Sequence, residues 1–190
     1  MISTTRGRII LLNGASSSGK TSIGRELLPL LADPWFLIPV DALGEMRSTV
    51  HTRVLDDAEI GATLTRTRIG YHRMVAGLAS AGNHVIMDYP LSEDWRLEDL
   101  VKTLSGYDVT VVEVRCSPTE LARREKARGD RPIGLANSQT RVYAHDTHDI
   151  AVDTTHRSPA ECARDIVRAL DTLPTPKAFA RFSAPTTAPG

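Results

Sequence analysis

Apolar residues along the chain fall into two kinds of pattern. Five runs are short and almost continuously apolar, which is typical of parallel strands buried on both faces. The segments between them carry apolar residues at helical spacing, with glycine, proline or capping residues at several ends. The predicted strands span residues 8–13, 35–40, 84–87, 109–114 and 150–152, and the predicted helices span 21–31, 69–81, 118–127 and 158–170.

The alternation of strands and helices indicates the α/β class. Right-handed crossovers between parallel strands place helices on both sides of a sheet. We therefore predict a three-layer, doubly wound fold with a mostly parallel five-stranded sheet. Ligands are expected at the carboxyl ends of its strands.

The chain has 190 residues and is 41% hydrophobic, which suits one domain with one packed core. From Pro174 onward, prolines lie among alanine, serine and threonine, with Phe179 and Phe182 as the bulky apolar residues. This composition predicts a folded domain over 1–173 and a flexible C-terminal tail over 174–190, with a docked phenylalanine as a variant of that prediction.

Charge and cysteine content narrow the class of protein further. The 23 basic and 23 acidic side chains balance, so no overall field attracts nucleic acid or an anionic membrane. No apolar run approaches the ~20 residues that span a bilayer, and residues 1–8 do not resemble an export signal. Cys116 and Cys162 are expected to be reduced thiols. We expect a cytoplasmic protein, and these features leave a homo-oligomer open.

One motif carries specific chemistry. Residues 14–21, Gly-Ala-Ser-Ser-Ser-Gly-Lys-Thr, match the pattern G-x-x-x-x-G-K-[ST] between a predicted strand and a predicted helix. Such a loop points backbone N–H groups at phosphates, and side chains in place of its glycines would block them. The fold is therefore predicted to be of the P-loop kinase type. The predicted nucleotide-binding residues are Gly14, Ser16, Ser17, Ser18, Gly19, Lys20, Thr21 and Ser22.

The same loop predicts a magnesium ion together with the nucleotide. Lys20 can place its ammonium group against the β- and γ-phosphates as a catalytic residue, and the Thr21 hydroxyl can coordinate Mg²⁺. Asp88 follows a predicted strand, where a carboxylate can hold Mg²⁺ through its water shell or serve the acceptor instead. No Asn-Lys-x-Asp segment of the guanine-reading type is present, which favours ATP over GTP.

Asp41 is a candidate general base. It directly follows the predicted strand 35–40 and should project into the crevice at that strand's carboxyl end. There its carboxylate could orient an acceptor hydroxyl and take its proton. A helix N-cap or a solvated turn residue explains an aspartate at this position equally well.

Arginines gather near the end of the predicted helix 118–127. Arg128 and Arg131, beside a glycine, could close over the phosphates as part of a mobile lid. For Arg123 and Arg124, solvated pairing with Glu120 or Glu125 is the favoured interpretation.

The chain resembles the chloramphenicol phosphotransferase family, small P-loop kinases that transfer the γ-phosphate of ATP to a hydroxyl group of an antibiotic. The resemblance spans roughly Arg8 to Leu170. It rests on the segments Ile10–Thr21, Val40–Asp41, Val85–Asp88, Ala127–Arg131 and Val152–His156.

This resemblance implies an ATP- and Mg²⁺-dependent enzyme with a small-molecule alcohol as acceptor, an antibiotic in the leading interpretation, and hence antibiotic resistance. It assigns Asp41 as the base, Lys20 and the glycine loop to the phosphates, and Arg128 to Arg131 to a closing segment, in which Arg131 is catalytic. It also places residues 153–155 near adenine, so that Thr154 contacts the nucleotide.

The acceptor region departs from the family, because residues 42–67 and 89–94 match none of its chloramphenicol-binding segments. Five arginines with few aromatic neighbours would suit a more polar acceptor, and a solvated helix face explains them equally well. They are Arg47, Arg53, Arg66, Arg68 and Arg73. A metabolic kinase acting on a sugar, nucleoside or similar compound, and a non-catalytic nucleotide-operated switch, remain alternatives.

Overall fold

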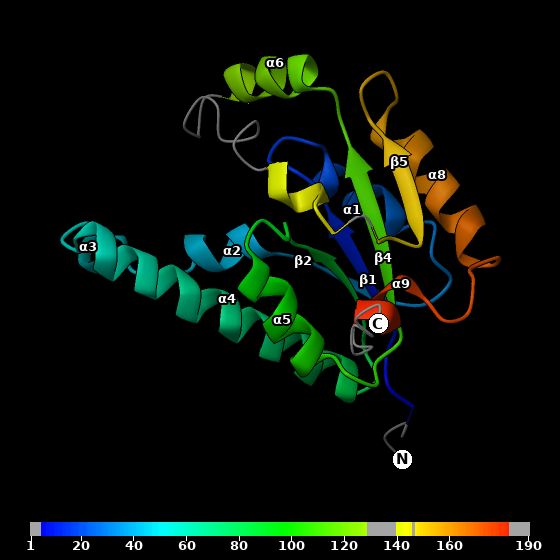
Figure 1. The fold of residues 1–190 in the computed structure, drawn as a ribbon, viewed down its shortest axis with the longest axis horizontal. Coiled ribbons are helices and arrows are strands. Elements are labelled where there is room, and N and C mark those ends of the chain that lie inside the picture. Colours follow the sequence, from blue (N-terminus) through cyan, green and yellow to red (C-terminus); the bar gives the residue numbers. More distant parts are fainter. Residues whose placement is uncertain (1–4, 129–139, 146, 183–190) are drawn as a thin grey trace, which may run out of the picture.

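A five-stranded sheet organises the computed structural model, which describes residues 5–128, 140–145 and 147–182. The strands are β1 (Ile9–Asn13), β2 (Trp35–Pro39), β3 (His84–Asp88), β4 (Val109–Arg115) and β5 (Ile150–Asp153). They lie in the order β2-β3-β1-β4-β5, and every neighbouring pair is parallel (Figure 1). The predicted five-stranded α/β sheet is confirmed.

The two faces of the sheet are covered by different helices, as Figure 1 shows. Because side chains alternate along a strand, Ile9 and Leu11 of β1 pack on one side, whereas Ile10 and Leu12 pack on the other. The first side is covered by α4 (Asp57–Ser80) and α5 (Asp94–Thr103), and the second by α1 (Lys20–Leu27) and α8 (Pro159–Leu170). The three-layer prediction is therefore confirmed.

Capping boxes fix the start of two helices. Ser158 precedes α8, and its Oγ accepts from the backbone N–H of Glu161 while the Glu161 carboxylate accepts from the Ser158 N–H. Asp56 and Glu59 form the same arrangement at the start of α4. The predicted helix over 69–81 is thus only the second half of α4, and α5 was not predicted at all.

Shorter elements surround the carboxyl ends of the strands. They are α2 (Val40–Glu45), α3 (Thr49–Thr52), α6 (Pro118–Arg128) and the 3-10 helix η1 (Thr140–Tyr143). In Figure 1, α6 and η1 lie above the tips of the central strands, while α2 continues directly from β2. Parallel strands thus deliver several connections to one edge of the sheet, where the fold predicts a ligand site.

Part of the predicted tail is a docked helix. Residues Ala178–Phe182 form α9, in which Ala178 and Phe179 are buried in the same core as α4 and α5. The Ala178 N–H donates to Asp149 Oδ1 at 2.6 Å, and Lys177 pairs with Asp108. Phe179 is therefore docked, as the variant of the tail prediction had it, whereas residues 183–190 lie outside the described residues.

We predict that Phe179→Ala lowers the free energy of unfolding by about 3 kcal/mol, because it removes a buried aromatic side chain and leaves a cavity. Urea denaturation measures this change. Phe36→Ala on β2 is the matched control, since Phe36 is 49% exposed and its loss should cost far less. Equal destabilisation by the two variants would contradict the docking of α9.

No helix among residues 5–128, 140–145 and 147–182 has the length and apolar character that crossing a bilayer requires. Both cysteines are buried free thiols, as expected for a chain without disulfides. Burial raises the pKa of the Cys162 thiol above its ordinary value, which disfavours the reactive thiolate.

Candidate active site

The loop between β1 and α1 requires glycine for two physical reasons. Gly19 has φ of 96°, in the left-handed region that favours glycine. A Cβ on Gly14 would lie 2.4 Å from the carbonyl oxygen of Val114, because the loop passes directly beside β4. Ser17 also adopts a positive φ, of 61°. The loop is therefore tightly curled, as a phosphate-binding loop must be.

Lys20 lies inside this loop. Its side chain is 8% exposed, and its ammonium group donates to the carbonyl oxygens of Gly14 at 2.9 Å and Ala15 at 2.8 Å. The same nitrogen lies 3.9 Å from Asp88 Oδ1. The cation is thus buried at the mouth of the loop, held by groups that a phosphate oxygen can replace.

Thr21 and Asp88 meet at the carboxyl edge of the sheet. The Thr21 hydroxyl donates to Asp88 Oδ2, and Asp88 itself is 6% exposed at the end of β3. The register pairs Asp88 with Leu12 of β1, two residues before Gly14. Strand pairing therefore delivers this carboxylate to the first turn of α1.

Asp41 lies in the first turn of α2. The N-cap of that helix is Pro39, so the alternative interpretation of Asp41 as an N-cap is wrong. Pro39 pairs with Asp88 across β2 and β3, which brings the start of α2 to the carboxylate edge. Asp41 is exposed and lines the same pocket as Lys20.

One pocket of about 790 Å³ joins these groups. It is lined by seven cationic side chains and two carboxylates, so positive groups outnumber negative ones in the lining, although the chain has no net charge. The cations are Lys20, Arg25, Arg47, Arg68, Arg96, Arg124 and Arg157, and the carboxylates are Asp41 and Asp88. Such a site suits anionic ligands.

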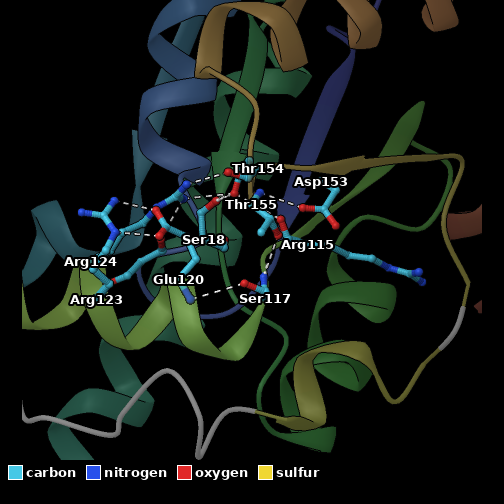
Figure 2. Close-up of polar contacts among 10 residues, drawn as sticks. Ser18, Arg115, Ser117, Glu120, Arg123, Arg124, Asp153, Thr154 and Thr155 are labelled. Carbon is cyan, nitrogen blue, oxygen red and sulfur yellow. Dashed lines mark hydrogen bonds and ion pairs between the residues drawn. The ribbon is translucent and has the colours of Figure 1, made fainter.

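Arg124 ties the P-loop to the segment after β5, as Figure 2 shows. Its guanidinium group donates to the carbonyl oxygen of Thr154 at 2.6 Å and to the Thr154 hydroxyl at 3.1 Å. The same group reaches the Ser17 carbonyl at 3.5 Å, and the Thr154 hydroxyl donates to the Ser18 carbonyl at 2.8 Å. Thr154, predicted to contact the nucleotide, is therefore part of the loop's support and lines the pocket.

Glu120 explains part of the arginine cluster on α6. Its carboxylate accepts from Arg123 and Arg124, which together lower its pKa to about 2. The predicted pairing of both arginines with Glu120 is confirmed. The side chain of Arg123 is 68% exposed, and its ion pair with Glu120 is the role that the structure shows for it. Arg124 also lines the pocket, which the sequence interpretation missed.

Two further residues, Asn13 and Tyr143, bond the P-loop region to loops that are distant in the sequence. Buried Asn13 donates to the Val142 carbonyl at 2.6 Å and accepts from the Leu91 N–H at 2.9 Å. Tyr143 of η1 accepts from the Ala15 N–H at 3.3 Å and donates to the Val114 carbonyl at 3.0 Å. These bonds hold the segment after β3, at Leu91, and the segment of η1 beside the P-loop.

The predicted site residues separate into three groups. The structure brings most of them together along the pocket wall, namely Ser16, Ser17, Gly19, Lys20, Thr21, Ser22, Asp41, Asp88 and Thr154. Gly14 and Ser18 belong to the buried inner part of the loop. Arg128 is the last residue of α6, and the predicted catalytic Arg131 lies outside the described residues.

Known proteins resemble this chain in sequence and in fold. A Mycobacterium tuberculosis protein provisionally named an O-phosphotransferase is 30% identical, over 96% of this chain and 90% of its own length. A gluconokinase from Sinorhizobium meliloti matches with a TM-score of 0.60 and 20% identity, over 88% of this chain and 94% of the gluconokinase chain. A shikimate kinase from Acinetobacter baumannii, solved with shikimate, matches with a TM-score of 0.63 and 16% identity, over 87% of this chain and 94% of the shikimate kinase chain.

At these identities the two solved kinases show the fold alone, and they confirm the P-loop kinase type. The family model described as chloramphenicol phosphotransferase-like protein matches residues 7–171. This match confirms the resemblance found in the sequence. The chain therefore belongs to the chloramphenicol phosphotransferase-like family and is a phosphotransferase.

Proposed function

We propose that this protein transfers the γ-phosphoryl group of ATP to a hydroxyl group of a small molecule. The observation that carries the proposal is the single pocket in which Lys20, Thr21, Asp88 and Asp41 all take part. A phosphate-binding loop, two oxygen ligands for a cation and a carboxylate base are the parts that phosphoryl transfer to an alcohol needs.

The nucleotide would occupy the half of the pocket that the P-loop forms. Backbone N–H groups from Gly14 to Ser22 would hold the phosphates, while Lys20 would exchange its carbonyl partners for phosphate oxygens. Thr154 would border the adenine base, and Arg128 and Arg131 would bind the phosphates, as the family resemblance implies. Positioning of this kind supplies most of the catalysis in phosphoryl transfer.

Thr21 and Asp88 fit a magnesium ion. Both present oxygen atoms, the donor type that Mg²⁺ prefers, and they already lie in contact beside Lys20. The ion would be held by the Asp88 carboxylate and the Thr21 hydroxyl, together with phosphate oxygens and water. When bound, the ion would neutralise charge on the β- and γ-phosphates.

Asp41 would act as the general base. Its carboxylate would accept a hydrogen bond from the acceptor hydroxyl and take the proton as the new oxygen–phosphorus bond forms. The bond between the γ-phosphorus and the bridging oxygen breaks, so that ADP leaves and the acceptor becomes a phosphate monoester. Lys20 would stabilise the charge that develops on the transferred group.

The leading acceptor in the sequence interpretation is an antibiotic, with resistance as the biological result. The described pocket lining contains no phenylalanine, tyrosine or tryptophan, and it carries Arg47, Arg68 and Arg96 beyond Asp41. This lining supports a polar acceptor, either a polar antibiotic or a metabolite, over a nitrophenyl compound that would need apolar contact.

The experiment that tests the function measures ADP release by the purified protein with Mg-ATP and panels of antibiotics, sugars, nucleosides and hydroxy acids. Mass spectrometry of each product then looks for the gain of one phosphoryl group. ADP release that depends strictly on one class of alcohol would support the proposal. Failure of Mg-ATP to bind at all would overturn it.

A matched pair of arginine variants tests the support of the P-loop. We predict that Arg124→Gln weakens Mg-ATP binding about ten-fold, because it removes charge-assisted bonds to Ser17 and Thr154. Arg123→Gln should change the affinity less than about two-fold, since an exposed ion pair contributes little. Calorimetric titration measures both, and equal affinities in the two variants would contradict the supporting role of Arg124.

A further inference from the structure

Three arginines from separate parts of the chain line the same pocket as Asp41. Arg47 follows α2, Arg68 lies on α4, and Arg96 lies on α5. Arg47 is held against α4 by a long hydrogen bond of 3.4 Å to the Thr67 hydroxyl. Two other cations of the same pocket, Lys20 and Arg124, bond to carbonyl groups of the P-loop, whereas none of these three arginines does so in the described part of the chain.

The positive charge of these three arginines is incompletely balanced. Arg96 is 4% exposed, pairs with Glu93 and donates to the Pro90 carbonyl at 3.0 Å, yet its Nε is buried without a hydrogen-bond partner. Arg68 forms no hydrogen bond or ion pair with any residue in the described part of the chain. Arg96 is therefore paired with one carboxylate, Glu93, whereas the carboxylates of Glu93 and Asp41 act on half-buried Arg68 only through their charge.

Another arginine on the same helix, Arg73, has its positive charge neutralised by a carboxylate. Arg73 lies near the middle of α4 and donates to both carboxylate oxygens of Asp99, with Nη2 at 2.9 Å from Oδ1. Asp99 thus neutralises Arg73, and its pKa is lowered as a result. Arg68 has no such partner among the described residues, although it lines the pocket with Lys20 and Asp41.

The electrostatics around Arg68 are unfavourable without an anion. Burial lowers the pKa of its guanidinium group, and the nearby positive charge of Arg96 lowers it further. The carboxylates of Glu93 and Asp41 act in the opposite direction and offset this only in part. A bound oxyanion would relieve the repulsion and use the planar donor fork of arginine, which matches carboxylate and phosphate geometry.

We propose that the acceptor alcohol also carries an anionic group, a carboxylate or a phosphate monoester, which binds Arg68 with Arg47 and Arg96 alongside. This inference rests on the proposed phosphotransferase function and names the chemical class of its acceptor. Arg68 anchors the charged end, and Asp41, whose charge acts on Arg68, holds the hydroxyl end. The acceptor is thereby oriented at both ends.

The test uses the full chain saturated with AMP-PNP and Mg²⁺, so that the P-loop is filled. Sulfate, D-glycerate, glycerol 3-phosphate and neutral glycerol are then titrated at constant ionic strength, with binding followed by NMR. At least one anion should bind the wild type about ten-fold more tightly than glycerol. The carboxylate and phosphate probes distinguish the two anionic groups.

Arg68→Gln should weaken binding of that anion about ten-fold or more and leave the affinity for AMP-PNP within about two-fold. Arg66→Gln, two residues earlier on an exposed part of α4, is the matched control and should leave both affinities unchanged. Circular dichroism confirms that the variants fold.

Several results would overturn the inference. One is that the AMP-PNP-bound wild type binds none of the anions at concentrations up to about 20 mM, where a ligand with a millimolar dissociation constant would be detected. Another is a loss of AMP-PNP affinity in Arg68→Gln as large as its loss of anion affinity, which would assign Arg68 to nucleotide binding. Turnover with neutral alcohols alone would also overturn it while leaving the proposed function intact, whereas failure of AMP-PNP to bind would overturn both.

Discussion

Asp41→Asn is expected to reduce kcat for phosphoryl transfer about 10³-fold, because it removes the group that accepts the proton of the acceptor hydroxyl. The asparagine side chain keeps the size of aspartate and can still accept a hydrogen bond, so acceptor binding should change little. Affinity for Mg-ATP should stay within about two-fold, since the P-loop with Lys20 binds the phosphates. Steady-state ADP release and calorimetric titration separate the two effects.

Glu45→Gln provides the control for Asp41→Asn. Glu45 is an exposed carboxylate at the end of the same helix, α2, and does not line the pocket. Its substitution removes the same charge from the same element, so it reports any general effect of charge on catalysis. Turnover of Asp41→Asn equal to that of Glu45→Gln would remove Asp41 from the mechanism.

Lys20→Met is expected to lower kcat/KM about 10³-fold and to weaken Mg-ATP binding at the same time. The methionine side chain can fill the space of the buried lysine stem, but it brings no charge to the β- and γ-phosphates. It also leaves Asp88 without the nearby ammonium group. Unlike Asp41→Asn, this variant should therefore lose nucleotide affinity as well as turnover.

Lys102→Met tests whether loss of any lysine has this effect. Lys102 is exposed on α5 and does not line the pocket. We expect its kinetic constants to match those of the wild type. Unchanged turnover and unchanged nucleotide affinity in Lys20→Met would exclude the P-loop as the phosphate site, and with it the proposed function.

Local signals were sufficient for the sheet and for the P-loop. Five apolar runs predicted five strands, and the match over residues 14–21 predicted the loop that follows β1. In contrast, the residue before α5, Glu93, makes no side-chain capping bond, so that helix lacks a start signal. The first half of α4 contributes no buried residue, since its buried side chains begin at Tyr71, and it therefore lacks an apolar stripe.

The pocket lining depended on contacts between distant residues. The spacing of Arg124 from Glu120 predicted a helical ion pair, which is present, but its bonds to Thr154 and Ser17 cross 30 and 107 positions. Arg96 enters the pocket from a helix that was not predicted. Short-range patterns carry no information on such pairs, because only the packing of strands and helices brings them together.

The concentration of positive charge in the pocket has a consequence for the remainder of the molecule. Seven cations and two carboxylates line the pocket, whereas the whole chain has a formal charge of zero. The remaining residues must therefore carry a net negative charge equal to the pocket's excess. Small anions are attracted at the opening of the pocket, which favours capture there and makes the association rate fall as salt is added.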